Sequence, residues 1–101
     1  MELTFVDRIA IKNLIPERVN MIKGMLFNSI AQKVDFTPEE IKRHELLNEE
    51  TIINNITETI DVVFEESELA VLKERIDEVD QAGTIPLQFI DSYYKIKNTS
   101  V

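Results

Sequence analysis

The chain has 101 residues, 44% of them hydrophobic, so its length and apolar content fit one domain, residues 1–101, with its own core. It contains no cysteine, which excludes disulfides, thiol nucleophiles and thiolate zinc sites. A formal net charge of −8 disfavours nucleic acid and anionic membranes as partners, because phosphate groups repel an acidic surface.

The N-terminus and the hydropathy of the chain bear on its location. Residues 1–5 lack the basic region and the long apolar core of a signal peptide. No apolar run approaches the ~20 residues that a membrane-spanning helix needs. We therefore expect a cytoplasmic protein that has no membrane partner.

The N-terminal third predicts two helices. Thr4 suits the N-cap of the first, with Asp7 completing a capping box, and Pro16 should end this helix near Leu14. Asp7 and Arg8 are expected near the polar face, opposite an apolar face made of Val6, Ile9, Ala10 and Leu14.

The second helix is expected to begin near Glu17 or Arg18 and to end at about Val34. Its apolar residues exceed one stripe, which predicts a helix that crosses the centre of the core. Gly24 lowers helix propensity and predicts a close helix crossing. The apolar set comprises Val19, Met21, Ile22, Met25, Leu26, Phe27, Ile30, Ala31 and Val34.

A third, short helix follows the segment Phe36–Ile41. Thr37 suits its N-cap, Pro38 its first position and Glu40 a capping box, while Phe36 and Ile41 are expected to meet as a hydrophobic staple. This helix should end by residue 43 or 44. The segment after it predicts a small antiparallel β-meander with strands at Glu45–Leu47, Thr51–Asn54 and Thr59–Val63.

Two helices are expected in the C-terminal part. The first runs from Glu66 to about Ala82, behind a Phe64 staple, with Gly83 as a left-handed cap and an apolar seam of Leu69, Leu72, Ile76 and Val79. The last begins at Ile85-Pro86 and has two adjoining apolar faces, one with Leu87, Ile90 and Tyr94 and the other with Phe89, Tyr93 and Ile96. The elements together predict a mostly helical α+β fold: two N-terminal helices, a short helix, the meander and two C-terminal helices.

Charged residues are distributed unevenly along the chain. Residues 1–57 carry 7 basic and 9 acidic side chains, and residues 58–101 carry 4 basic and 10 acidic ones, giving −2 and −6. A solubilising surface on helices explains this most simply. The alternative is an acidic face that docks a basic protein or imitates DNA phosphates.

His44 is the one histidine of the chain and the first candidate for acid–base or metal chemistry, together with Glu39, Glu40 and Glu45. A surface histidine at a helix end is the simpler interpretation. Residues 77–83 faintly resemble a calcium loop, but the end of a helix explains them better.

Two further patterns were weighed as sites. An aromatic and basic patch at Tyr93, Tyr94, Lys95 and Lys97 is explained more simply by packing of the last helix. With two glycines in the chain, no phosphate-binding loop is possible. The sequence therefore predicts no catalytic, cofactor-binding or metal-binding residue.

The order of these elements is itself informative. It runs from Leu3-Thr4 and Leu14-Ile15-Pro16 through Phe36–Ile41 and the strand residues 45–63, and then through Phe64, Glu68-Leu69, Gly83–Pro86 and Tyr93, Lys95 and Ile96. In this order the chain resembles, over almost its whole length, a family of small proteins of unknown function encoded by tailed phages and prophages. The resemblance implies a phage or prophage context and a protein-interaction role, and it supplies no catalytic residue.

Three functional hypotheses follow. The first is a non-enzymatic interaction or assembly module that binds a protein partner or a second copy of itself and takes no small-molecule substrate. It predicts an uncovered apolar patch on helix 17–34 or 86–97. The second is an acidic inhibitor or DNA mimic, which requires the carboxylates of residues 58–80 to gather on one face. The third is a small metal-dependent hydrolase that uses His44 and nearby glutamates.

Overall fold

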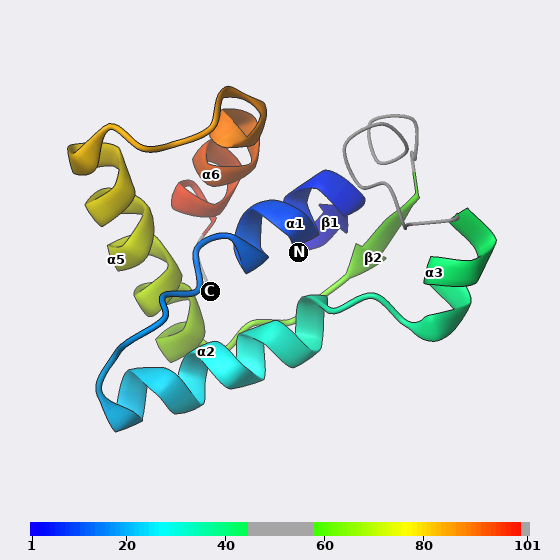
Figure 1. Ribbon diagram of the computed structural model, residues 1–101, viewed down its shortest axis with the longest axis horizontal. Coiled ribbons are helices and arrows are strands. Elements are labelled where there is room, and N and C mark those ends of the chain that lie inside the picture. Colours follow the sequence, from blue (N-terminus) through cyan, green and yellow to red (C-terminus); the bar gives the residue numbers. More distant parts are fainter. Residues whose placement is uncertain (45–57, 100–101) are drawn as a thin grey trace.

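The computed structural model describes residues 1–44 and 58–99, and most of these residues are helical (Figure 1). A two-stranded antiparallel sheet accompanies the helices, which confirms the α+β class. In chain order the elements are β1 (Glu2–Thr4), α1 (Phe5–Lys12), α2 (Met21–Val34), α3 (Pro38–His44), β2 (Thr59–Asp61), α5 (Glu66–Ala82), the 3-10 helix η2 (Leu87–Phe89) and α6 (Ile90–Lys97).

The sheet joins the N-terminus to the segment that precedes α5. β1 pairs with β2, with Leu3 opposite Ile60, and the amino group of Met1 binds Asp61 Oδ1 at 2.9 Å. The strand expected at 59–63 is confirmed in a shorter form, but neither β1 nor its pairing with β2 was predicted. The other two strand candidates, 45–47 and 51–54, lie outside the described residues.

α1 is the central helix of the described structure. It packs against α2, α6 and β1, and the side chains of Phe5, Ala10 and Ile11 are fully buried. The predicted capping box is confirmed: Thr4 Oγ1 accepts from the Asp7 N–H at 3.1 Å, and the Thr4 N–H donates to Asp7 Oδ2 at 3.0 Å. The prediction that Asp7 and Arg8 lie near a polar face was wrong, since both side chains are buried. Each has polar partners inside the protein that replace water.

α2 differs from its prediction in both its start and its place. Its N-cap is Asn20, whose Oδ1 accepts from the Lys23 N–H at 2.9 Å, so the helix begins at residue 21 rather than 17 or 18. Of its side chains Phe27, Ile30 and Val34 are buried, while most apolar residues of its first two turns are exposed. The expectation that α2 crosses the centre of the core was therefore wrong. One stripe faces the core, and α1 occupies the centre.

Replacement of each of the two glycines by alanine should change the free energy of unfolding, in opposite directions at the two positions. A Cβ on Gly24 would meet Val19 Cγ2 at 3.5 Å, an ordinary contact, so no close helix crossing requires this glycine, contrary to the prediction. Gly83 has φ +68°, a left-handed conformation that costs an alanine about 1–2 kcal/mol. We expect Gly24→Ala to raise the free energy of unfolding by about 0.5–1 kcal/mol and Gly83→Ala to lower it. Urea denaturation checks both; a destabilised Gly24→Ala protein would show that the helix surface there is closely covered.

The predictions for α3 and α5 are largely confirmed. Glu40 Oε1 accepts from the Thr37 N–H at 2.9 Å while Thr37 Oγ1 accepts from the Glu40 N–H at 3.1 Å, which is the expected capping box. The Phe36 ring lies 5.1 Å from that of Phe5, and its staple with Ile41 stays a prediction. α5 has the predicted bounds, with three of its four seam residues buried and Gly83 as its left-handed cap.

Candidate functional site

A groove of about 500 Å³ lies between the C-terminal half of α5 and α6. We call it the C-terminal groove. Side chains of Ile76, Ile85, Ile90 and Tyr93 form its apolar part, and its other lining residues are Asp77, Asp80, Gly83, Tyr94, Lys97 and Asn98.

Local signals in the sequence produce this groove. The left-handed turn at Gly83 ends α5, and the following segment leads through Pro86 into η2 and α6. The face of the last helix with Phe89, Tyr93 and Ile96 is buried. The adjoining face stays uncovered, with exposed fractions of 85% for Leu87, 47% for Ile90 and 72% for Tyr94.

A hydrogen bond of Tyr93 fixes the α6 side of the groove, and charged side chains line its rim. Tyr93 donates its hydroxyl to the Ala10 carbonyl at 2.9 Å, and burial raises the pKa of Tyr93 to about 12, so this hydroxyl stays protonated and holds α6 on α1. At the rim, Lys97 forms an ion pair with Asp77 across the groove, and Asp80 adds a second carboxylate. The charged lining residues are thus two acids and one base, which leaves the rim acidic.

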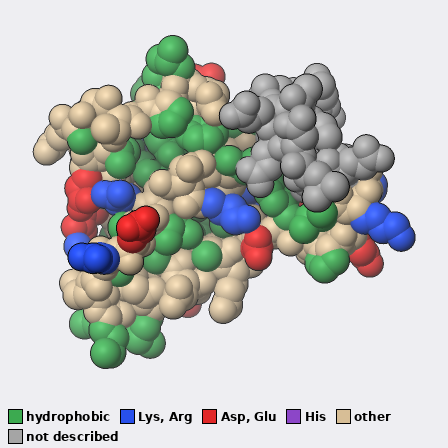
Figure 2. Space-filling model, viewed as in Figure 1, with side chains coloured by type: hydrophobic (Ala, Val, Ile, Leu, Met, Phe, Trp, Pro, Cys, Tyr) green, Lys and Arg blue, Asp and Glu red, His purple; other side chains and the backbone are tan. Residues whose placement is uncertain are grey.

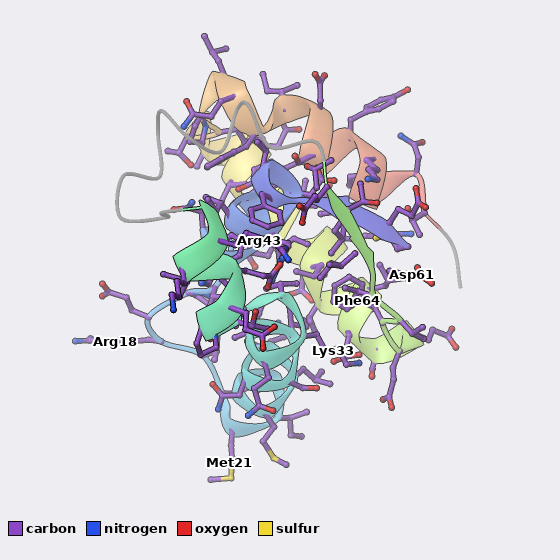
Figure 3. All side chains as sticks on the ribbon, turned by 90° about the vertical axis from the view of Figure 1, so that its right-hand side faces the viewer. Arg18, Met21, Lys33, Arg43, Asp61 and Phe64 are labelled. Atoms are coloured by element: carbon purple, nitrogen blue, oxygen red, sulfur yellow. The ribbon has the colours of Figure 1, made fainter. Side chains whose placement is uncertain are left out.

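The second uncovered apolar surface is the N-terminal end of α2 with the residue before its cap, and we call it the apex patch. Exposed fractions are 42% for Val19, 82% for Met21, 76% for Ile22 and 68% for Met25. Figure 2 shows hydrophobic side chains at the lower left, over this end of α2, and again at the top, over η2 and α6. In Figure 3 Met21 points away from the body of the protein at the bottom of the view, and Arg18 extends into solvent at the left.

Inside the protein, Arg8 connects α1 to the end of α2 and to α3. Its Nε donates to the Val34 carbonyl at 3.0 Å and Nη2 to the Asp35 carbonyl at 2.6 Å. The guanidinium binds both carboxylate oxygens of Glu40, at 2.6 and 2.9 Å, and lies 4.4 Å from the centre of the Phe36 ring. The hydrogen bonds to Arg8 lower the pKa of Glu40 to about 2. Each of its three nitrogens donates a hydrogen bond to a group of the protein itself, so this cluster is structural rather than catalytic.

Asp7 forms a second buried cluster, between α1 and α6. Its Oδ1 accepts from Ser92 Oγ at 2.6 Å, and its Oδ2 accepts from Lys95 Nζ at 2.8 Å and from the Thr4 N–H. Burial opposes the charge of Asp7, but hydrogen bonds from Lys95, Ser92 and Thr4 outweigh burial and lower its pKa. The Ser92 hydroxyl donates to a carboxylate inside the protein and is itself buried, so it is not placed to attack a substrate.

Of the residues proposed for a hydrolase site, the structure describes the side chains of Glu39 and Glu40. Glu39 is exposed, and Glu40 forms an ion pair with Arg8. His44 ends α3, but its side chain and Glu45 lie outside the described residues. Within residues 1–44 and 58–99, no three His, Asp or Glu side chains are grouped closely enough to hold a metal ion.

The other two weighed patterns follow their simpler interpretations in the described structure. Asp77 and Asp80 belong to the last turns of α5, as expected for a helix end. Tyr93 is buried and Lys95 and Lys97 each bind a carboxylate, so the aromatic and basic patch does not form. Tyr94 is the exception to the packing interpretation, because 72% of it is exposed.

The apolar side chains of both surfaces are recognisable in the sequence, but which of them are uncovered is not. The burial of Asp7 and Arg8 was not predicted either. The sequence holds one indication that Arg8 is buried. Phe5 and Phe36 occur in two capped segments, and the guanidinium group of an arginine stacks well on aromatic rings, as that of Arg8 does on both. The pairing of Arg8 with Glu40, 32 residues away, had no local signal.

Comparisons with other proteins add no constraint on this site. No protein-family model matches the chain, and no curated protein or solved structure shows significant similarity to it. The likeness to phage proteins therefore stays a prediction. In the part of the chain that the structure describes, no helix has the length and apolar character to cross a bilayer.

Proposed function

We propose that the chain is a non-enzymatic protein-interaction or assembly module that acts through the C-terminal groove and the apex patch. One observation carries the proposal: most of the exposed large apolar side chains of the described residues form two clusters, Val19, Met21, Ile22 and Met25 around α2 and Leu87, Ile90 and Tyr94 around α6, while Ile41 and Val63 are exposed singly elsewhere. Contiguous exposed apolar surface marks binding sites for other macromolecules. A phage or prophage context and action in the cytoplasm of the host cell are part of this proposal.

The chemistry of the groove favours binding over catalysis. Its floor is apolar, and at its rim the one described ammonium group, that of Lys97, is paired with Asp77. Such a surface suits apolar side chains that project from a helix or an extended peptide. General acid–base catalysis instead needs two groups whose pKa values are shifted apart in one cleft.

The acidic-mimic alternative has less support. Six of the nine carboxylates in residues 58–80 form ion pairs with cations of the protein itself, which leaves few to imitate phosphates. These six are Glu58 with Arg43, Asp61 with the N-terminus, Glu68 with Lys33, Glu74 with Lys23, Asp77 with Lys97 and Glu78 with Arg75.

Site-specific photo-crosslinking tests the proposed function. A photoreactive amino acid is placed at Ile22 or Leu87, and at Glu39 on α3 as an exposed control, and cells that contain the protein naturally are irradiated. We expect protein adducts from positions 22 and 87 and none from position 39, because only the first two lie in uncovered apolar surface. Mass spectrometry identifies the adducts. Equal labelling at all three positions, or none at any, would rule out a binding role for these surfaces.

A further inference from the structure

We propose that the apex patch of one copy binds in the C-terminal groove of a second copy, so that the chain assembles head to tail. This inference rests on the proposed function and names its partner. It follows from three properties of the two surfaces: their positions, their shapes and their charges.

The two surfaces lie on opposite sides of α5. α2 packs on one side of this helix and α6 on the other, and in Figure 1 the N-terminal end of α2 lies at the bottom edge and α6 at the top. The side of α5 that faces the start of α2 carries Val71, Glu74 and Glu78, whereas Ile76, Asp77 and Asp80 line the groove. The apex patch is therefore separated from the groove of its own chain and stays available to another copy.

The apex patch projects from the protein, whereas the C-terminal groove is hollow, so the first could fit into the second. The apex patch is a convex helix end in which Met25 follows Ile22 by three positions and Met21 by four, spacings with which helices insert side chains into grooves. The groove offers apolar walls and the aromatic ring of Tyr94, and methionine adapts its shape to such walls and contacts aromatic rings favourably.

One charged side chain beside each surface can pair with one beside the other, and at the apex patch this is Arg18, which follows the exposed Glu17. Arg18, which directly precedes Val19 of the apex patch, extends into solvent, whereas the groove rim carries Asp77 and Asp80 against Lys97. Since Asp77 is already paired with Lys97, Asp80 is the carboxylate best suited to meet an incoming Arg18. A basic group beside a convex apolar patch thus matches an acidic group beside a concave one.

Such a contact is heterologous, because it joins two different surfaces. Each copy keeps one unused patch and one unused groove, so association continues into open chains unless the rotation between copies closes a ring. This property separates the proposal from a symmetric dimer, in which the same surface of both copies meets.

Two single-surface variants test the inference. The apex variant carries Met21→Glu and Ile22→Glu, and the groove variant carries Ile90→Glu and Tyr94→Glu; all four residues are exposed, and far-UV circular dichroism checks that both variants fold. Light scattering after size exclusion measures mass over a concentration series. We expect the mass of the wild-type protein to grow with concentration and each variant alone to stay at 11.7 kDa. Their equimolar mixture should stop at twice that mass, because the groove of the apex variant can bind the patch of the groove variant and no further contact can form. Lys42→Glu, which changes net charge by as much as the apex variant, should assemble like wild type.

Three results would overturn the inference: a wild-type protein that stays monomeric at every concentration, a groove variant that self-associates alone, or a mixture that does not pair. The photo-crosslinking separates this failure from that of the proposed function. Adducts at positions 22 and 87 with a different protein would leave the proposed function standing, whereas the absence of any adduct would remove both.

Charge reversal supplies a second test that leaves the apolar side chains in place. Arg18→Glu and Asp80→Arg should each weaken assembly, since each places like charges at the contact, and a chain that carries both changes should recover it. Recovery by the double variant requires that Arg18 of one copy meets Asp80 of the next. If the double variant assembles no better than the single ones, the proposed register is wrong.

Discussion

Replacement of Arg8 by alanine is expected to lower the free energy of unfolding by about 3–5 kcal/mol, the usual cost of removing one partner from a buried ion pair. The side chain is 1% exposed and joins α1 to Val34, Asp35 and Glu40. Its loss leaves the Val34 and Asp35 carbonyl groups without the donors that Arg8 supplies, and it leaves the Glu40 carboxylate without a countercharge. Urea denaturation at neutral pH measures the loss.

Arg18→Ala is the matched control, because it removes the same kind of side chain from an exposed position. Its effect should stay within about 0.5 kcal/mol. If the Arg8 variant lost no more stability than the Arg18 variant, the buried ion pair would not hold α3 to the rest of the protein.

The same ion pair also predicts how stability changes in acid. The pKa of Glu40 falls from 4.5 to about 2 on folding, so its contribution is complete above pH 4.5 and is lost as the pH falls from there toward 2. Glu40→Gln should remove this part of the acid dependence. An unchanged acid dependence in the Gln variant would show that other carboxylates account for it.

Replacement of Asp7 by alanine is expected to lower the free energy of unfolding by about 2–3 kcal/mol, since it removes a buried acceptor of charged and neutral hydrogen bonds. Ser92 loses the acceptor of its buried hydroxyl, Lys95 loses its carboxylate and the Thr4 N–H loses its cap. Because these bonds hold α6 on α1, we also expect the variant to assemble more weakly through the C-terminal groove.

Asp91→Ala is the control for this prediction, since Asp91 is an exposed acid in the first turn of α6. It should leave both stability and assembly close to those of wild type. Denaturation and the light-scattering series measure the two effects. Full assembly by an Asp7→Ala protein that is destabilised as expected would show that α6 keeps its place without this cluster.

Much of the secondary structure was predictable because its causes are local. The N-caps at Thr4 and Thr37 and the left-handed end at Gly83 each involve residues three or four positions apart. The bounds of α5 follow from such signals and from a regular apolar seam. α2 begins at residue 21, later than predicted, because the side chain of Asn20 caps it by accepting from the Lys23 N–H.

The sequence shows which apolar residues the two candidate surfaces contain, but it does not show where in the fold those residues lie. The sequence alone determined that the helices carry more apolar side chains than one stripe needs, that local caps end them where they do, and that the surface is acidic. Tertiary structure decided that β1 pairs with β2, that α1 rather than α2 lies in the centre, and that Arg8 finds Glu40. It also decided which apolar side chains stay uncovered, those of the apex patch and of the groove face of α6. The physical reason is that apolar character sets the preference of a side chain for burial, whereas burial itself depends on distant residues that pack over it.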